Sequence, residues 1–110
     1  MHQLISAILT LPKFENRITR MLPVEVPLSG ALPGGYSVQQ KNIEPQELEI
    51  VGPDSHVRAA QRLGSDPFDL TVTGLTGTTE QILSVYAPDP ELRFLGDPRV
   101  KVKILVHRLP

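Results

Sequence analysis

The chain has 110 residues, enough for one domain with a single hydrophobic core. Its 11 Lys and Arg residues nearly balance 12 Asp and Glu residues, so no basic excess favours nucleic acid or an anionic membrane. The absence of cysteine excludes a disulfide framework, a thiolate nucleophile and cysteine metal ligands. The 11 prolines and 8 glycines favour short elements joined by turns over a helical bundle.

The first apolar run, from Leu4 to Leu11, is too short to span a bilayer as a helix. No Lys or Arg precedes it and no Ala-x-Ala site follows, so a signal peptide is not indicated. We predict a short helix or strand there, and we assign residues 1–20 to an N-terminal extension of unknown relationship. Membrane attachment, if the protein has it, is expected through a segment outside this chain.

Apolar and polar residues alternate from Ile18 to Leu28, which predicts a strand with one buried face. Arg20 alone interrupts the apolar parity. Pro23 and Pro27 occupy the other parity and cannot donate ladder hydrogen bonds, so we expect an edge strand or an irregular one. A turn over 29–35 follows.

Extended structure is predicted from Tyr36, and again over 47–51, where Leu48 and Ile50 face inward. One short helix is predicted within 54–64. Asp54 or Ser55 would cap its first turn, and Gly64 would end it in a left-handed conformation. Val57, Ala60 and Leu63 would form its buried face.

The remaining pattern is again extended, in four segments separated by Gly and Pro turns. These segments are 68–72, 79–86, 92–95 and 100–106. The predicted fold class is therefore mainly β, a small domain of mixed parallel and antiparallel strands with one short helix. The predicted core includes Val24, Val26, Leu48, Ile50, Leu70, Val100, Val102 and Ile104.

The stretch Gly52-Pro53-Asp54 joins a strand to a helix, an order that can cradle a phosphate. However, it has one glycine, a proline without an N–H, and a carboxylate that would repel the anion. We interpret it as a corner. If Gly52 has a positive φ, its replacement by valine should cost about 1–3 kcal/mol.

Other candidate sites are also weak. His2, His56 and His107 lack metal-ligand spacing and are expected at the surface. No serine lies in a Gly-x-Ser-x-Gly context. Glu47 and Glu49 share one strand face and could share a proton, but that face is the solvated one. The aspartates beside prolines or turns are expected to cap local amides, and no calcium loop is present. They are Asp66, Asp69, Asp89 and Asp97.

Two further patterns have structural interpretations. Residues 74–79 carry the glycines and hydroxyls of a binding loop but no cation, so we predict a hairpin-like connection. Lys101 and Lys103 lie on the outward parity of the last strand, where we expect them to protect a sheet edge from aggregation. The residues thus predict no catalytic, cofactor-binding or metal site, and no enzyme.

The order of several short motifs resembles that of a YbbR-like domain, from about Met21 to Val106. The first four are Leu22-Pro-Val-Glu-Val-Pro-Leu28, Pro33-Gly-Gly-Tyr-Ser-Val38, Ile43-Glu-Pro45 and Leu48-Glu-Ile-Val-Gly-Pro53. The later ones are Phe68-Asp-Leu70, Gly74-Leu-Thr-Gly-Thr78, Leu92 to Leu95 and Pro98-Arg-Val-Lys-Val102. We therefore predict a YbbR-like domain over 21–106 and a C-terminal tail over 107–110.

The resemblance implies an extracytoplasmic, non-catalytic domain in a membrane-anchored parent protein, with the chain itself soluble. It also implies a fold similar to a ribosomal L25-type domain. Members encoded beside a membrane diadenylate cyclase regulate that enzyme, which makes cyclic di-AMP. The expected partner is therefore a protein, such as that cyclase, with no small-molecule substrate, cofactor or nucleic acid. An RNA-binding β domain of the L25 type is the alternative, which balanced charge and few aromatic residues disfavour.

Overall fold

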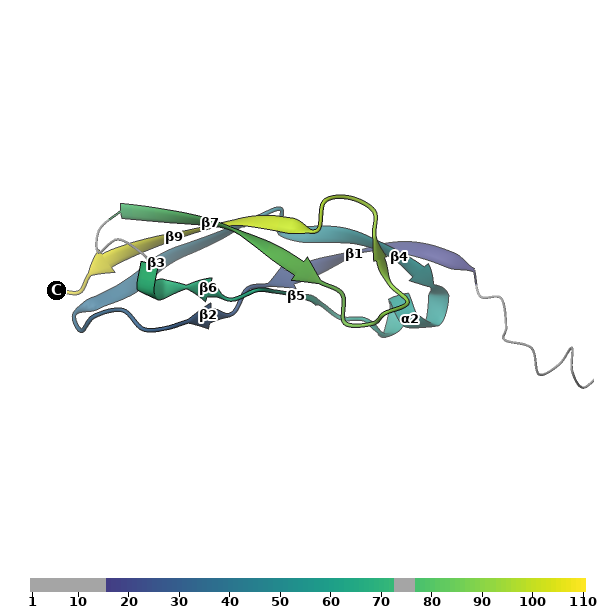
Figure 1. The fold of residues 1–110 in the computed structure, drawn as a ribbon, viewed down its shortest axis with the longest axis horizontal. Coiled ribbons are helices and arrows are strands. Elements are labelled where there is room, and N and C mark those ends of the chain that lie inside the picture. Colours follow the sequence, from purple (N-terminus) through teal and green to yellow (C-terminus); the bar gives the residue numbers. More distant parts are fainter. Residues whose placement is uncertain (1–15, 73–76) are drawn as a thin grey trace, which may run out of the picture.

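Strands carry most of the chain in the computed structural model, which describes residues 16–72 and 77–110 (Figure 1). Seven strands form one sheet in the order β3-β9-β7-β5-β1-β4-β8. They are β1 (Arg17–Glu25), β3 (Tyr36–Glu44), β4 (Glu47–Pro53), β5 (Leu63–Ser65), β7 (Gly77–Tyr86), β8 (Arg93–Phe94) and β9 (Arg99–Arg108). A second sheet pairs β2 (Leu28–Ser29) with β6 (Phe68–Asp69).

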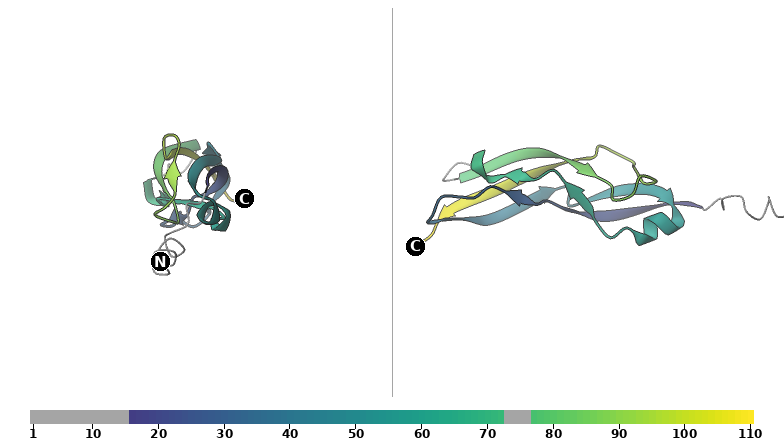
Figure 2. Two further views of the ribbon diagram at one scale, coloured as in Figure 1. Left: turned by 90° about the vertical axis from the view of Figure 1, so that its right-hand side faces the viewer. Right: turned by 60° about the horizontal axis from the view of Figure 1, so that its bottom comes forward.

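Both strand directions occur, which confirms the predicted fold class. β1 runs parallel to β5, and β2 runs parallel to β6, while the other pairs are antiparallel. The large sheet is drawn out along one axis and curls around it when seen end-on (Figure 2). β3, β7 and β9 occupy one half of its length, whereas β1, β4 and the helix α2 (Asp54–Ala59) occupy the other (Figure 1).

The core lies on the inner face of this curled sheet, where the predicted alternation holds. Val100, Val102, Ile104 and Val106 of β9 are each at most 2% exposed. Of the predicted core residues, all but Leu48 are buried, and Leu48 is partly buried against the same cluster. Phe68, Leu63 and Val57 add fully buried side chains from the shorter elements.

Of the two alternatives predicted for the first strand, the edge position is wrong, because β1 lies between β4 and β5. Pro23 within β1 and Pro27 just after it are accommodated because the pairing with β5 is short. β5 contacts β1 in register only at Val24 and Glu25, which lie between Pro23 and Pro27. The missing proline N–H groups therefore fall outside the pairing with β5.

The helix is shorter than predicted and begins differently. α2 ends at Ala59, Ala60 is extended, and Gly64 lies in β5 without a positive φ. Ala60 and Leu63 are buried as predicted, but from extended chain. The N-cap is Pro53 with no side-chain capping bond, and the Asp54 carboxylate instead accepts a hydrogen bond from Arg58 one turn later.

Arg20 explains both the early helix end and the break in the apolar parity of β1. Its Nη1 donates hydrogen bonds to the carbonyl oxygens of Val57 at 3.2 Å and Ala60 at 2.9 Å. These carbonyls would otherwise lack partners at a helix C-terminus. The guanidinium group of Arg20, from a neighbouring strand, thus ends the helix in place of the predicted Gly64.

Lys101 and Lys103 do not protect an edge, because β9 lies between β3 and β7. Both ammonium groups instead lie near the Glu80 carboxylate of β7, at 3.7 and 3.8 Å. The strands at the two ends of the sheet order are β3 and β8. β8 has two residues and β3 has nine, so of these two end strands β3 presents the longer edge.

Candidate functional site

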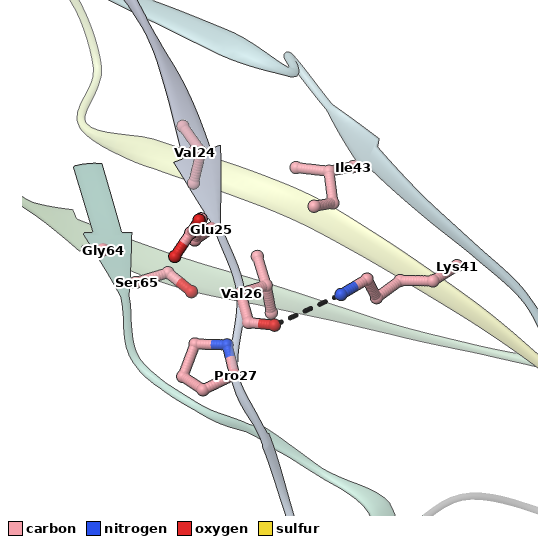
Figure 3. A pocket seen from close by; sticks show the side chains of 8 residues that line it. All are labelled: Val24, Glu25, Val26, Pro27, Lys41, Ile43, Gly64 and Ser65. Carbon is pink, nitrogen blue, oxygen red and sulfur yellow. Dashed lines mark hydrogen bonds between the residues drawn. The ribbon is translucent and has the colours of Figure 1, made fainter. Parts of the chain in front are cut away.

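A groove of about 560 Å³ opens where the curled sheet fails to close between β1 and β3 (Figure 3). Its lining residues come from the end of β1, from the two residues that follow it, from β3 and from β5. They are Val24, Glu25, Val26, Pro27, Lys41, Ile43, Gly64 and Ser65. Within the described chain, β3 forms a strand ladder with β9 alone, so its other edge borders this opening.

The register of β3 places a lysine on the core-facing side of that edge. The ladder with β9 shifts between Val38 and Gln40, as at a β-bulge, after which Lys41 pairs with the buried Ile104. Residues paired across an antiparallel ladder lie on the same face of the sheet. Lys41 therefore points toward the inner side, where alternation would otherwise place an apolar residue.

The Lys41 side chain extends across the groove from β3 toward β1 (Figure 3). Its Nζ donates a hydrogen bond to the Val26 carbonyl oxygen at 3.3 Å. The one carboxylate in the lining, that of Glu25, accepts instead from Arg62 at 3.3 Å. The groove thus combines the partly apolar walls of Val24, Val26 and Ile43 with a lysine ammonium group that donates to a neutral carbonyl.

A second, smaller hollow of about 170 Å³ contains a histidine–aspartate pair between α2 and the loop after β7. Nδ1 of His56 donates to Oδ2 of Asp89 at 2.5 Å. The amide of Glu91 donates to the same carboxylate at 2.8 Å, and these two hydrogen bonds lower the pKa of Asp89. The pair fastens the helix to the loop.

Sequence reasoning placed His56 at the surface and did not find this pair. Its side chain is 39% exposed and that of Asp89 is 29% exposed. The two residues are 33 positions apart, so no local spacing signals the contact. The described residues lining the hollow include no hydroxyl or thiol nucleophile, so the geometry supports a structural clasp.

The stretch 52–54 is a strand-to-helix corner, as interpreted from the sequence. β4 runs through Pro53 directly into α2, and the Asp54 amide donates to the Asn16 carbonyl at 3.0 Å. Gly52 has no positive φ, so the condition attached to its predicted effect is not met. A Cβ atom at Gly52 would nevertheless lie 2.8 Å from Cδ2 of Leu92 and 3.0 Å from the Glu91 carbonyl oxygen.

A family model described as YbbR-like protein matches residues 22–104, which is most of the chain. The chain belongs to the YbbR-like family. No curated protein matches it. Among solved structures, this YbbR-like domain is similar to the solution structure of SuR18C from Streptococcus thermophilus, with 16% identity and a TM-score of 0.65. That match covers 90% of this chain and 93% of the other, and it shows a shared fold.

The other candidate residues of the YbbR-like domain are not gathered into one place. Glu47 and Glu49 are exposed on β4, as predicted, and Glu49 is paired with Met21 of β1. Ring atom Nε2 of His107 lies 2.8 Å from Oγ of Ser37. His2 and residues 74–76 lie outside the described residues. Within 16–72 and 77–110, no three His, Asp or Glu side chains are grouped as metal ligands.

Two of the four predicted aspartate caps are confirmed. Asp69 accepts from the amide of Thr71 at 2.9 Å and from its hydroxyl at 2.6 Å, and these bonds lower the pKa of Asp69. Asp89 accepts from an amide as described above. Asp97 instead forms an ion pair with Arg99, and the Asp66 carboxylate accepts from the Tyr86 hydroxyl.

No helix in the described part of the YbbR-like domain has the length and apolar character needed to cross a bilayer.

Proposed function

We propose that this domain is a non-catalytic interaction module that modulates a membrane-bound diadenylate cyclase from outside the membrane. The observation that carries the proposal is the YbbR-like family match over 22–104. In this proposal the domain belongs to a membrane-anchored parent protein at the cell envelope. Its effect on cyclic di-AMP synthesis comes through protein contact rather than through chemistry of its own.

The architecture is suited to protein recognition. A well-packed sheet holds the loops and the long β3 edge in fixed positions, which favours binding with little rearrangement. A module of this size can offer about 800 Å² to a partner. One copy should therefore bind weakly, and several copies in one protein would gain affinity through avidity.

The alternative of an L25-type RNA-binding domain finds less support in the charges. The formal net charge is −1, and the lysine pair on the outer face of β9 is shared with the Glu80 carboxylate. An RNA surface needs cations free to contact phosphates and aromatic rings for stacking. The chain has three Phe, two Tyr and no Trp.

Small ligands are not part of the proposed function. We expect neither ATP, cyclic di-AMP, Ca²⁺ nor Zn²⁺ to bind with micromolar affinity. Pro53 and Asp54 spoil the phosphate-like corner for nucleotides, and the described His, Asp and Glu side chains form no ligand set for a metal ion. Isothermal titration calorimetry on the purified chain checks this expectation. A saturable heat signal at micromolar concentration for any of the four would contradict it.

The test of the proposal is to express the full-length protein that carries this domain together with a membrane diadenylate cyclase of the same organism. Cellular cyclic di-AMP is measured with and without residues 21–106, and co-purification of the two proteins is recorded. We expect the deletion to change the cyclic di-AMP level and to reduce co-purification. Equal cyclic di-AMP together with no co-purification would leave the cyclase without a role as partner.

A further inference from the structure

The open edge of β3 and the groove beside it have a chemistry that selects a particular kind of partner segment. β3 is a nine-residue strand that contains no proline, and it forms a ladder on one side only within the described chain. An exposed strand edge offers a row of backbone N–H and C=O groups, which an extended peptide can pair with. This part of the argument concerns where a partner binds.

We propose that the β3 edge and the groove accept an extended, acidic segment of a protein partner, whose carboxylate side chain pairs with Lys41. This proposal rests on the proposed function as an interaction module and specifies its contact site. The segment would add a strand beside β3, in the gap that the Lys41 side chain now crosses to reach the Val26 carbonyl (Figure 3).

Charge complementarity identifies the segment as acidic. The Lys41 ammonium contacts a neutral carbonyl at 3.3 Å, and the neighbouring Glu25 carboxylate is already engaged by Arg62. A carboxylate that enters the groove would exchange a long, neutral hydrogen bond for a charge-assisted one. The alternate side chains of the segment would contact the partly apolar walls of Val24, Val26 and Ile43.

The same lysine disfavours other occupants. An inward-pointing charge on an edge strand is a device that prevents pairing with apolar edges. Antiparallel pairing of β3 with the β3 edge of a second copy would bring two Lys41 ammonium groups to one seam. A basic segment would meet the same repulsion, so the residue both repels the wrong strands and attracts the right one.

Nuclear magnetic resonance can test the proposal with defined probes. The ¹⁵N-labelled chain is titrated with a blocked eight-residue peptide of alternating valine and glutamate, and with its valine–lysine counterpart. We expect the acidic peptide to shift amide signals of β3 and of Val24 to Val26, and to bind at least about tenfold more tightly than the basic peptide. Equal binding of the two peptides, or no binding at millimolar concentration, would overturn the proposal.

Charge reversal provides the matched control. Lys41→Glu should bind the acidic peptide about tenfold more weakly and the basic peptide more tightly than the wild type does, since the charge at position 41 is reversed. Lys101→Glu makes the same change in net charge on the outer face of β9 and should leave both affinities unchanged. Equal effects of the two variants would show that only overall charge matters, and the proposal would fail. An unchanged amide spectrum away from β3 confirms that Lys41→Glu folds. Lys41→Gln removes the charge without reversing it, and its loss in binding free energy for the acidic peptide should be about half that of Lys41→Glu.

The two proposals can fail separately. If the full-length protein co-purifies with the cyclase but Lys41→Glu co-purifies equally well, the groove is not the contact and the interaction module stands. If the acidic peptide binds at β3 while cyclic di-AMP does not respond to the domain, the groove stands and its partner is another acidic protein.

Discussion

Gly52 shows how one residue without a side chain allows the loop before β8 to pack against β4. The glycine is buried in β4, and a methyl group there would press on Leu92 and on the Glu91 backbone. The requirement is for space, since its φ is not positive.

Replacing Gly52 with alanine should therefore destabilise the domain by about 1–3 kcal/mol, as overpacking a core does, and valine should cost more. Chemical denaturation measures the change. Gly64→Ala is the matched control, because a methyl group at Gly64 would have no atom within 4 Å and its φ is not positive. A Gly52→Ala variant as stable as Gly64→Ala would contradict the close packing of Leu92.

Arg20 is the second residue whose role depends on distant backbone. Arg20→Met keeps much of the side-chain stem and removes the hydrogen bonds to the carbonyls of Val57 and Ala60. We expect a loss of about 1–2 kcal/mol in the free energy of unfolding, since hydrogen bonds from charged groups are worth about 1.5–3 kcal/mol before exposure is allowed for. Arg62→Met, which breaks an exposed ion pair with Glu25, should cost less than about 1 kcal/mol. A reversed order of the two losses would refute the capping role.

At the scale of elements, the contact between α2 and the loop after β7 should make the stability of the domain depend on pH in the acid range. The pKa of Asp89 is lowered by the Glu91 amide and by His56, so its contribution is present above the ordinary aspartate pKa of about 3.9 and is lost as pH falls through the lower folded value. Asp89→Asn should lose less stability than the wild type between about pH 5 and about pH 2. Thermal unfolding across that range gives the comparison, and parallel curves would show that Asp89 is not part of the acid response.

The β3 edge gives a second prediction at this scale. Lys41→Val removes the inward charge and completes an apolar face along a strand with one unpaired edge. This variant should therefore self-associate more strongly than the wild type at the same concentration. Lys103→Val makes the same replacement on β9, which is paired on both sides, and should change association less. Sedimentation velocity distinguishes the two variants. Equal association would mean that apolarity alone, rather than the edge, controls self-pairing.

How far the sequence predicted these elements depended on whether the signal was local. The alternation of apolar and polar residues correctly predicted which residues of β1 and β9 face the core, because a period of two depends only on neighbouring residues. The helix end was missed because Arg20, 40 positions before Ala60, supplies the capping donor. The edge assignments of β1 and β9 were also missed, since strand order is set by long-range pairing that periodicity does not encode.

The features of the candidate site also differ in whether a local sequence signal predicts them. The corner at 52–54 was predicted correctly, because its Gly-Pro-Asp signal is local. The groove could not be found, because it requires β1, β3 and β5 to meet. Lys41 does carry a local signal, as a charge between Val38 and Ile43 in an otherwise apolar inner row, but the bulge after Val38 hides its parity.

At the scale of the whole molecule, this YbbR-like domain combines a packed core with a long open edge on β3. This combination favours a role in holding or biasing a partner, because no described element must move for the edge to be available. In the function that we propose, this partner is a membrane-bound diadenylate cyclase.

The most direct measurement is the rate of cyclic di-AMP formation by the cyclase reconstituted in lipid vesicles with the full-length protein that carries this domain. The rate is compared with that of the same protein lacking residues 21–106, at matched amounts in the membrane. The account predicts a rate that changes with increasing full-length protein and saturates, and that returns to the level of cyclase alone when the domain is deleted. A rate that is the same with the full-length protein, with the deletion variant and with cyclase alone would contradict it.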